Sequence, residues 1–351
     1  MSERPNIDRP PSPDALKPRN VRRLGLEAAR QSGLIIAGKE PDQIAVLSIL
    51  IPTVEDQLNR HDRTRQKWVP ADLLPRDPQT GQIFFNPENP EENIVLSPEA
   101  QAAMIVNLLT EDNLPAYHRT IADNFGLDGA WGTWTNQWTA EESNHATVMR
   151  DFLILSNAIN PAEDEAMRME QMKQGYDVEK DPLHTLAYVT FQELATRVSH
   201  RQTGIASNNK LADAMLKRIA QDENLHMLFY RNLAGAALDV APNQMMQAIR
   251  DEVMSFEMPG ANIQGFKVRS LEIANAGIYD LRRHLDEVVM PVLRKWKIFE
   301  REDFTGYGEL ARDELAAFLV NLEKAADDFD ANRESGRVEK TIALLKRREQ
   351  A

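Results

Sequence analysis

Two short stretches of the chain place a histidine three residues after a glutamate. Glu142 and His145 lie in the stretch 140-AEESNH-145, and Glu223 and His226 lie in 220-AQDENLH-226. On a helix, residues i and i+3 share one face with Cβ atoms about 5–6 Å apart, so both side chains of a pair can bind one metal ion. A single pair would fit an exposed helix face of an acidic chain equally well, so the interpretation depends on the rest of the sequence.

A further glutamate precedes each pair at matched spacing. Glu111 comes about thirty residues before Glu142, and Glu193 comes about thirty residues before Glu223, both among apolar residues. Two helix hairpins of this kind, packed as a four-helix bundle, would bring four carboxylates and two imidazoles together, as in ferritin-like di-iron and di-manganese proteins. Because four buried carboxylates repel one another unless cations neutralise them, the sequence predicts a site for two divalent metal ions.

Three nearby residues could act on this site. Pro115 cannot donate to the Glu111 carbonyl, which predicts a kink or a helix end near Asn113. Asp222, next to the second pair, could accept the ring N–H of a ligand histidine or be an ordinary surface charge. Thr196 would place a hydroxyl on the metal side or bond to its own helix.

The elements that must position these residues are predicted to be helices almost throughout. Ser97 followed by Pro98 marks a helix start, because serine caps the first turn and proline suits the first helical position. Helical periodicity predicts helices over residues 41–60, 97–124, 130–156, 160–175, 182–205, 208–237, 241–256, 268–300 and 308–331. The fold class predicted is all-α: a ferritin-like four-helix bundle core extended by additional helices.

The same pattern divides the chain into three parts. Residues 1–30 are rich in proline and polar residues and are expected to be a mostly disordered lead-in. Residues 31–331 are expected to form a single domain, and 332–351 a charged tail that could be helical.

The composition excludes several other kinds of site. The chain has 351 residues, a net charge of −13 and no cysteine, which rules out disulfides, a thiol nucleophile, thiolate zinc sites and iron–sulfur clusters bound by this chain. The acidic balance argues against a nucleic-acid partner. The N-terminus lacks the apolar segment of a signal peptide, and the longest apolar run is too short to span a bilayer. We therefore expect a cytoplasmic protein without a transmembrane segment.

The chain resembles the soluble acyl-acyl-carrier-protein (acyl-ACP) desaturases, the family of the plant stearoyl-ACP desaturases and their bacterial relatives. The resemblance covers about residues 40–330 and is carried by 68-WVPADLLPRDP-78, 109-LTEDNLPAY-117, 135-TNQWTAEESNH-145, 190-TFQELATRVSH-200, 220-AQDENLH-226 and, more weakly, 287-EVVMPVLRKWKI-298. It implies an oxidoreductase that inserts a cis double bond into a saturated acyl chain carried on acyl carrier protein, with two iron ions as cofactor and O₂ as co-substrate.

The resemblance also implies which residues bind the irons. Glu142 and Glu223 would bridge the metals, and Glu111 and Glu193 would be terminal ligands. The full ligand set implied is Glu111, Glu142, His145, Glu193, Glu223 and His226. Asp112 departs from the glutamate common at its position, but it is not a ligand. Pocket positions that are more polar here than in the plant enzymes, and so leave chain length and double-bond position open, are Thr120, Asp123 and Asn124.

Four further residues receive roles from the resemblance. Thr196 would supply a hydroxyl near the oxygen site, and Trp138 would pack close to the metals. Trp68, hydrogen-bonded through Asp222 and His145, would be a route for electrons from the surface.

The partners follow from chemistry and from the resemblance. With no cysteine cluster and no nucleotide-binding fingerprint, the electrons must come from a separate protein, expected to be of the ferredoxin type. The other expected partners are acyl carrier protein and a second copy of the chain in a homodimer. An acidic carrier needs a local basic surface, for which the candidates are 17-KPRNVRR-23, 294-RKWK-297 and 346-KRR-348.

Other readings of the ligand pattern remain open at this point. A ribonucleotide reductase small subunit would carry a radical tyrosine four residues after the first ligand histidine, where this chain has Met149. A ferritin-like storage subunit would be a single short bundle, much shorter than this chain. A hydroxylase, or a catalytically silent relative that only binds acyl carriers, would share the ligand set.

Overall fold

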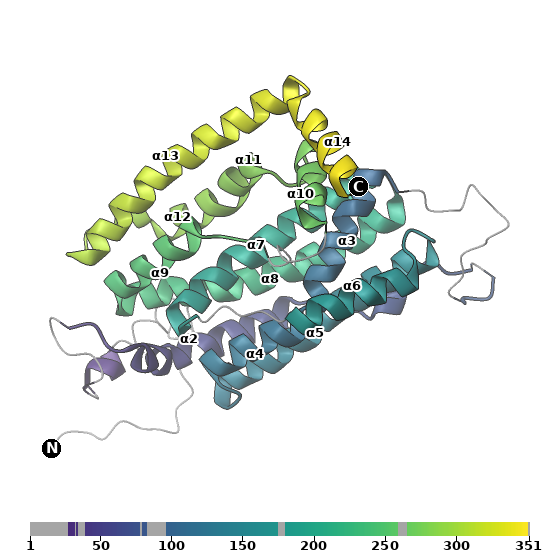
Figure 1. Cartoon of the computed structure of the whole chain (residues 1–351). Helices are drawn as coiled ribbons and strands as arrows, with labels where there is room; N and C mark the ends of the chain where they lie inside the picture. Colours follow the sequence, from purple (N-terminus) through teal and green to yellow (C-terminus); the bar gives the residue numbers. More distant parts are fainter. Residues whose placement is uncertain are drawn as a thin grey trace, which may run out of the picture.

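The computed structural model describes residues 27–31, 33, 39–77, 79–82, 96–174, 180–258 and 265–349. Within these residues the secondary structure is helical and no β-strand occurs, which confirms the all-α prediction. Most of the expected lead-in, residues 1–30, lies outside the described residues. Figure 1 shows the helices lying side by side, with the long α13 along one edge of the molecule.

Four helices form the central bundle. They are α3 (Pro98–Asp112), α5 (Gly129–Leu155), α7 (Pro182–Ala206) and α8 (Lys210–Val240). Each packs against two others, because α3 contacts α5 and α7, and α8 contacts the same two helices. At the start of three of these helices, a side-chain oxygen accepts a hydrogen bond from a backbone N–H group of the first turn. These N-cap residues are Ser97 for α3, Asp181 for α7 and Asn209 for α8.

The remaining helices cover this bundle. α2 (Gln43–Thr64) packs on α8 and α5, α4 (Leu114–Phe125) on α5 and α7, and α6 (Pro161–Gln174) on α3. α9 (Pro242–Met254) lies between α7 and the long α13 (Tyr307–Glu334). The bundle is thereby enclosed on several sides, so side chains that α3, α5, α7 and α8 direct toward one another are shielded from water.

Two predicted helices are interrupted in the structure. The first, 97–124, divides at Asn113 into α3 and α4, as expected from Pro115. The prediction of one helix over 268–300 is wrong. α10 (Phe266–Asn275) ends just before Gly277, whose φ of 68° is incompatible with a continued α-helix. Asp280 then caps a new helical segment. It consists of α11 (Leu281–Arg283), a π-helix over His284–Val289 and α12 (Met290–Trp296).

The C-terminal part of the chain is also helical. The expected boundary after residue 331 falls inside α13, which continues to Glu334. α14 (Arg337–Glu349) follows and packs on α10 through Val338, Ile342 and Val268. The tail is therefore attached to the helical body by an apolar contact.

None of the helices in the described part of the chain combines enough length with enough apolar character to cross a membrane.

Near the start of α5, Gly132 packs closely against the backbone of Leu127, and a substitution there tests this contact. A Cβ atom at Gly132 would lie 2.0 Å from the carbonyl carbon of Leu127, so we expect Gly132→Ala to destabilise the fold by about 1–3 kcal/mol. Thermal unfolding followed by circular dichroism would show a melting temperature several degrees lower. Ala140→Ser, at an exposed position of the same helix, is the control and should leave it unchanged. Equal melting temperatures for the two variants would contradict the assigned contact.

Candidate metal centre

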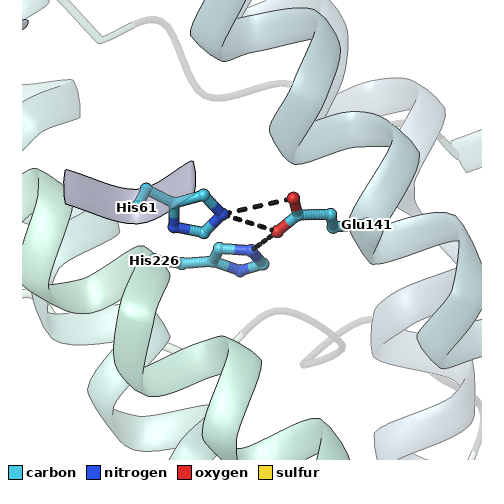
Figure 2. A group of neighbouring side chains, drawn as sticks. All are labelled: His61, Glu141 and His226. Carbon is cyan, nitrogen blue, oxygen red and sulfur yellow. Dashed lines mark hydrogen bonds and ion pairs between the residues drawn. The ribbon is translucent and has the colours of Figure 1, made fainter. Parts of the chain in front are cut away.

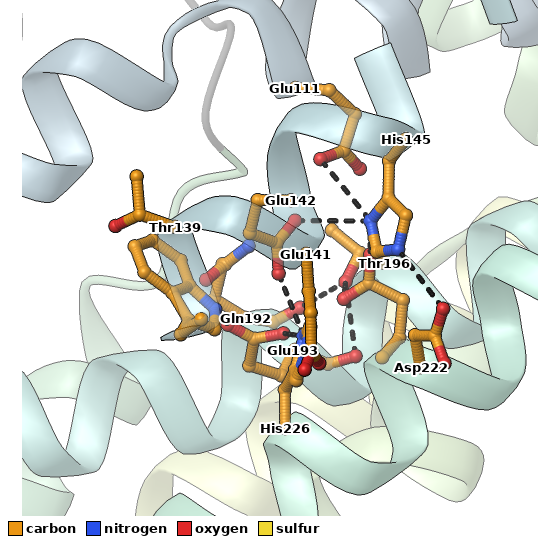
Figure 3. Close-up of polar contacts among 12 residues, drawn as sticks. Glu111, Thr139, Glu141, Glu142, His145, Gln192, Glu193, Thr196, Asp222 and His226 are labelled. Carbon is orange, nitrogen blue, oxygen red and sulfur yellow. Dashed lines mark hydrogen bonds and ion pairs between the residues drawn. The ribbon is translucent and has the colours of Figure 1, made fainter. Parts of the chain in front are cut away.

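The four bundle helices bring six acidic and histidine side chains to one place in the core (Figure 3). α3 supplies Glu111, α5 supplies Glu142 and His145, α7 supplies Glu193, and α8 supplies Glu223 and His226. All six are buried, with exposed fractions between 0% and 6%. These are the six residues singled out from the sequence as candidate ligands.

The six residues divide into two overlapping groups. The first contains Glu111, Glu142, His145 and Glu223, and the second contains Glu142, Glu193, Glu223 and His226; within each group the candidate ligand atoms all lie within 4.8 Å of one another. Glu142 and Glu223 belong to both groups. This arrangement can hold two metal ions that share two carboxylates, each ion with one imidazole and one further carboxylate.

Both imidazoles direct the Nδ1 atom toward the carboxylates. The Nδ1 atom of His145 lies 3.1 Å from Glu142 Oε2 and 3.2 Å from Glu223 Oε1. The Nδ1 atom of His226 lies 2.7 Å from Glu142 Oε1 and 3.5 Å from Glu193 Oε2. The two Nε2 atoms are therefore left to face outward, away from the shared carboxylates.

An outer carboxylate faces the Nε2 atom of His145. Asp222 Oδ2 lies 3.6 Å from that atom and accepts a hydrogen bond of 2.6 Å from the indole Nε1 of Trp68. The ring of Trp68 is nearly parallel to that of His145, with centroids 6.2 Å apart, and Arg218 forms an ion pair with the other oxygen of Asp222. The hydrogen bond between Trp68 and Asp222 is thus present, Asp222 lies close to His145 without a hydrogen bond, and Arg218 is an addition to these contacts.

A second outer carboxylate, Glu141, was not identified from the sequence. Glu141 Oε2 lies 3.0 Å from His226 Nε2 and 2.9 Å from His61 Nε2 (Figure 2), and Arg65 donates to Glu141 Oε1 at 2.6 Å. The available signal was the acidic residue directly before each ligand glutamate, Glu141 in one pair and Asp222 in the other. In the structure each acid lies beside the histidine of the other pair: Glu141 contacts His226, and Asp222 lies next to His145.

A third buried contact that sequence reasoning missed involves His200. The His200 Nε2 atom lies 2.9 Å from Glu111 Oε1, while Asn107 Nδ2 lies 3.2 Å from His200 Nδ1. Ser199 donates to Asn107 Oδ1, which orients the amide group so that its N–H meets Nδ1. The Nε2 atom is consequently the protonated one and donates to Glu111. Burial lowers the pKa of His200 to about 4, so this imidazole is neutral at pH 7.

Thr196 and Trp138 both contact carboxylates of the cluster. The Thr196 hydroxyl is within 2.8 Å of Glu223 Oε2 and 3.0 Å of the backbone oxygen of Glu193, so it faces the cluster and its own helix at once. Trp138 donates from Nε1 to Glu193 Oε1 at 3.1 Å and is buried. All four residues predicted to support the site therefore lie beside it.

The electrostatics of the cluster are those of carboxylates brought together out of water. Burial, and then the charges of Glu142 and Glu223, raise the pKa of Glu111 and Glu193 well above the usual value. Burial alone would lower the pKa of His145 and His226, but the charge of Glu142 and the hydrogen bonds around each ring raise it well above the usual value. Protons and divalent cations would thus compete for the same atoms.

The donor atoms suit metal ions. Five buried atoms of the cluster lie close to other polar atoms but form no well-directed hydrogen bond among the described residues: Glu142 Oε1, Glu193 Oε2, Glu223 Oε1, His145 Nε2 and His226 Nδ1. Unpaired buried polar atoms are costly, and carboxylate oxygen with imidazole nitrogen is a ligand set used by iron and other first-row divalent metals. The outer carboxylates also fit, because a hydrogen bond to Nε2 leaves the Nδ1 lone pair free for a metal.

Comparison with known proteins identifies the family. Residues 42–344 match the family model described as fatty acid desaturase, which covers most of the chain. The chain belongs to the fatty acid desaturase family. Among its relatives, DesA1 of Mycobacterium tuberculosis, which is named as an acyl-ACP desaturase, is 46% identical over 83% of this chain and 89% of its own length. A stearoyl-ACP 9-desaturase of Arabidopsis thaliana is 28% identical over 75% of this chain and 73% of its own.

A solved structure agrees with this family fold. The X-ray structure of DesA2 of Mycobacterium tuberculosis superposes with a TM-score of 0.60 over 78% of this chain and 99% of its own, at 23% sequence identity. The likeness supports the helical architecture of the family. At the position of the reductase radical tyrosine, this family member has Met149, which is fully buried among apolar side chains.

The raised pKa values predict how stability depends on pH. Protein freed of metal with a chelator should melt at progressively lower temperature as pH rises above about 6.5, because the raised pKa values of Glu111, Glu193, His145 and His226 stabilise the fold only while these groups hold protons. Between pH 4 and 6.5 the lowered pKa values of His200 and His284 act in the opposite direction and offset the two glutamates. Metal ions would replace those protons and flatten the curve. Thermal unfolding at a series of pH values measures both.

The matched control for this pH dependence is the double variant Glu111→Gln/Glu193→Gln. Because glutamine does not titrate, its chelator-treated form should lose less stability between pH 5 and pH 8 than the wild type does. A melting temperature that rises with pH above about 6.5 in the chelator-treated wild type would contradict the assigned protonation.

Proposed function

We propose that this protein is an acyl-ACP desaturase, which inserts a cis double bond into a saturated fatty acyl chain carried on acyl carrier protein. The observation that carries the proposal is the pair of overlapping Glu/His groups that share Glu142 and Glu223, in a chain that belongs to the fatty acid desaturase family. Relatives named as acyl-ACP desaturases at 46% and 28% identity support the choice of acyl carrier.

In this proposal the six buried residues hold two iron ions. Glu142 and Glu223, which belong to both groups, would be ligands of both ions, Glu111 with His145 would complete one site, and Glu193 with His226 would complete the other. Two bound irons together with O₂ supply an oxidant strong enough to remove hydrogen from a saturated carbon, which acid–base groups cannot do at neutral pH. The outer contacts of these residues come from Asp222, Glu141, His200 and Trp138.

The chain's own residues orient the ligands and exclude water. Glu141, hydrogen-bonded to Nε2 of His226, would fix the tautomer of that imidazole, and His200 donates to Glu111. Asp222 lies 3.6 Å from Nε2 of His145 and would orient that ring by its charge. Thr196 can rotate its hydroxyl proton between Glu223 and its own helix, which suits a group that holds or passes a proton beside the oxygen site. Four helices enclose the centre, so the reacting carbons would meet it in a dry environment.

A mainly apolar pocket with an open volume of about 20 Å³ lies beside the centre, and an acyl chain would enter it by displacing lining side chains. It lies between α4, α5 and α7, and Trp138, which donates to Glu193, forms part of its wall. The other lining residues nearest the cluster are Gln192 and Val189 on α7 and Ile121 and Tyr117 on α4. A saturated chain in this pocket would pass the metal centre along the Trp138 side.

Electron delivery and assembly complete the proposal. The chain has no cysteine, so it cannot hold an iron–sulfur cluster on its own thiolates, and a ferredoxin-type protein would supply the electrons. Trp68 lines a surface pocket together with Arg65, Lys67 and Asp222, and its indole connects that pocket to His145 through Asp222. The basic residues suit an acidic donor. A homodimer, as the resemblance implies, and a cytoplasmic location belong to the same proposal.

The reaction is tested by aerobic turnover of saturated acyl-ACPs with reduced ferredoxin and iron-loaded protein, followed by mapping of the product double bond. We expect an unsaturated acyl product from the wild type. Glu142→Ala should abolish it and lower the iron content well below two per chain, because both sites lose a ligand, whereas Glu55→Ala, exposed on α2, should keep both. Iron-loaded protein that forms no unsaturated product would refute the proposed reaction.

The role of Trp68 is tested by Trp68→Phe, which keeps an aromatic ring but cannot donate to Asp222. We expect unchanged iron content, at least tenfold slower turnover with the protein donor, and normal reduction by dithionite. Trp296→Phe is the matched control, because Trp296 is buried and donates to the backbone of Arg231, away from the centre. Normal donor-driven turnover by Trp68→Phe would exclude Trp68 as the route.

A further inference from the structure

The apolar pocket beside the metal centre has a defined direction. Its lining residues on α7 follow one another along the helix, from Gln192 next to the ligand Glu193, through Val189, to Thr185. With a rise of about 1.5 Å per residue, Gln192 and Thr185 lie about 10 Å apart along the axis. Lys180, just before the start of α7, also lines the pocket. One end of the pocket is therefore at the metal centre, and the other is at Lys180.

An ion pair occupies the end far from the metals. The Nζ atom of Lys180 lies 2.6 Å from Glu252 Oε2, and the exposed fractions of the two side chains are 11% and 5%. The same Nζ lies 4.6 Å from the centre of the Tyr188 ring, which is another wall of the pocket. Glu252 belongs to α9, so the pair joins the start of α7 to a helix that packs against it.

A hydrocarbon chain cannot displace this pair at low cost. Separating two buried charges leaves each without a partner and without water, which is strongly unfavourable, and a methyl group offers neither hydrogen bond nor charge in return. The lysine is also held by the face of the Tyr188 ring. An acyl chain that enters from the metal end would consequently stop where the Lys180 side chain begins.

We propose that the Lys180–Glu252 ion pair forms the closed end of the acyl pocket and sets the longest segment of chain that can extend beyond the reacting carbons. This inference rests on the proposed function, since it identifies the pocket as the place of the acyl chain. The substrates selected are saturated chains whose methyl end fits between Trp138 and Lys180. Longer chains are excluded by the ion pair.

Two double variants separate the charge of the pair from its volume. Lys180→Ala/Glu252→Ala removes both and deepens the pocket, whereas Lys180→Met/Glu252→Met removes the charges but keeps side chains of similar length. Replacing both partners of a buried pair by apolar groups is generally tolerated, so the fold should survive. Arg201→Ala/Asp213→Ala is the matched control. It removes an ion pair that joins α7 to α8, and neither of its residues lines the pocket.

The measurement is equilibrium binding of a series of saturated acyl-ACPs that differ by two carbons, without reductant so that no turnover occurs. For the first chain longer than the wild-type limit, we expect the alanine pair to bind about tenfold more tightly than the wild type, because two more methylenes become buried. The methionine pair, which keeps the volume but not the attraction between charges, should bind this chain more tightly than the wild type and less tightly than the alanine pair. The control pair should keep the wild-type limit. Iron content and melting temperature show that each variant is folded.

The outcomes distinguish this inference from the proposed function. Wild-type protein that binds and converts acyl-ACPs, together with an alanine pair that keeps the same length limit, would overturn the inference alone. A wild type that neither binds nor converts any acyl-ACP would overturn the proposed function and the inference with it. Should the alanine pair not fold, Lys180→Ala/Glu252→Leu keeps α9 packed and must still shift the limit to longer chains.

Discussion

The burial of four carboxylates at one point of a helical bundle is the constraint on which the rest of this structure depends. Glu111, Glu142, Glu193 and Glu223 are almost fully excluded from water, and the basic side chains that pair with them among the described residues are histidines. Such a cluster is stable only when protons or metal ions neutralise it. The raised pKa values of Glu111, Glu193, His145 and His226 have the same origin, because without metal ions these groups hold protons that reduce the negative charge of the cluster.

Around this cluster the protein repeats one arrangement twice. Each ligand histidine has an outer carboxylate at its Nε2 atom, Asp222 for one and Glu141 for the other, and each carboxylate is paired with an arginine. Glu141, which precedes Glu142, contacts His226, and Asp222, which precedes Glu223, lies next to His145. This exchange ties α5 to α8, since a change in the position of either helix would disturb both imidazoles. The positive charges of the arginines also offset part of the carboxylate charge near the surface.

The proposed acyl pocket and the candidate metal centre share the same helices. α7 carries Glu193 and, toward its start, the residues that line the pocket, while α5 carries two ligands and Trp138. The depth of the pocket is therefore fixed relative to the metals by the regular rise of one helix and not by a loop. In a family that acts on flexible hydrocarbon chains, such a rigid distance provides a physical basis for choosing which carbons react.

The sequence by itself determined the helical class and the six residues that converge, because helix periodicity and the repeated Glu…Glu-x-x-His spacing are local properties. It also located the break at Asn113 from Pro115. It failed at 268–300, where the helical pattern continues on both sides of Gly277. The helix ends there through local hydrogen bonds, from Gly277 N–H to the Ala274 carbonyl and from Ile278 N–H to the Ile273 carbonyl, with a positive φ that glycine tolerates. The partners of the cluster were likewise decided by tertiary structure: Glu141 reaches His226 across 85 positions, His200 reaches Glu111 across 89, and Lys180 reaches Glu252 across 72. No local pattern encodes such contacts, because they exist only once the helices have packed against one another.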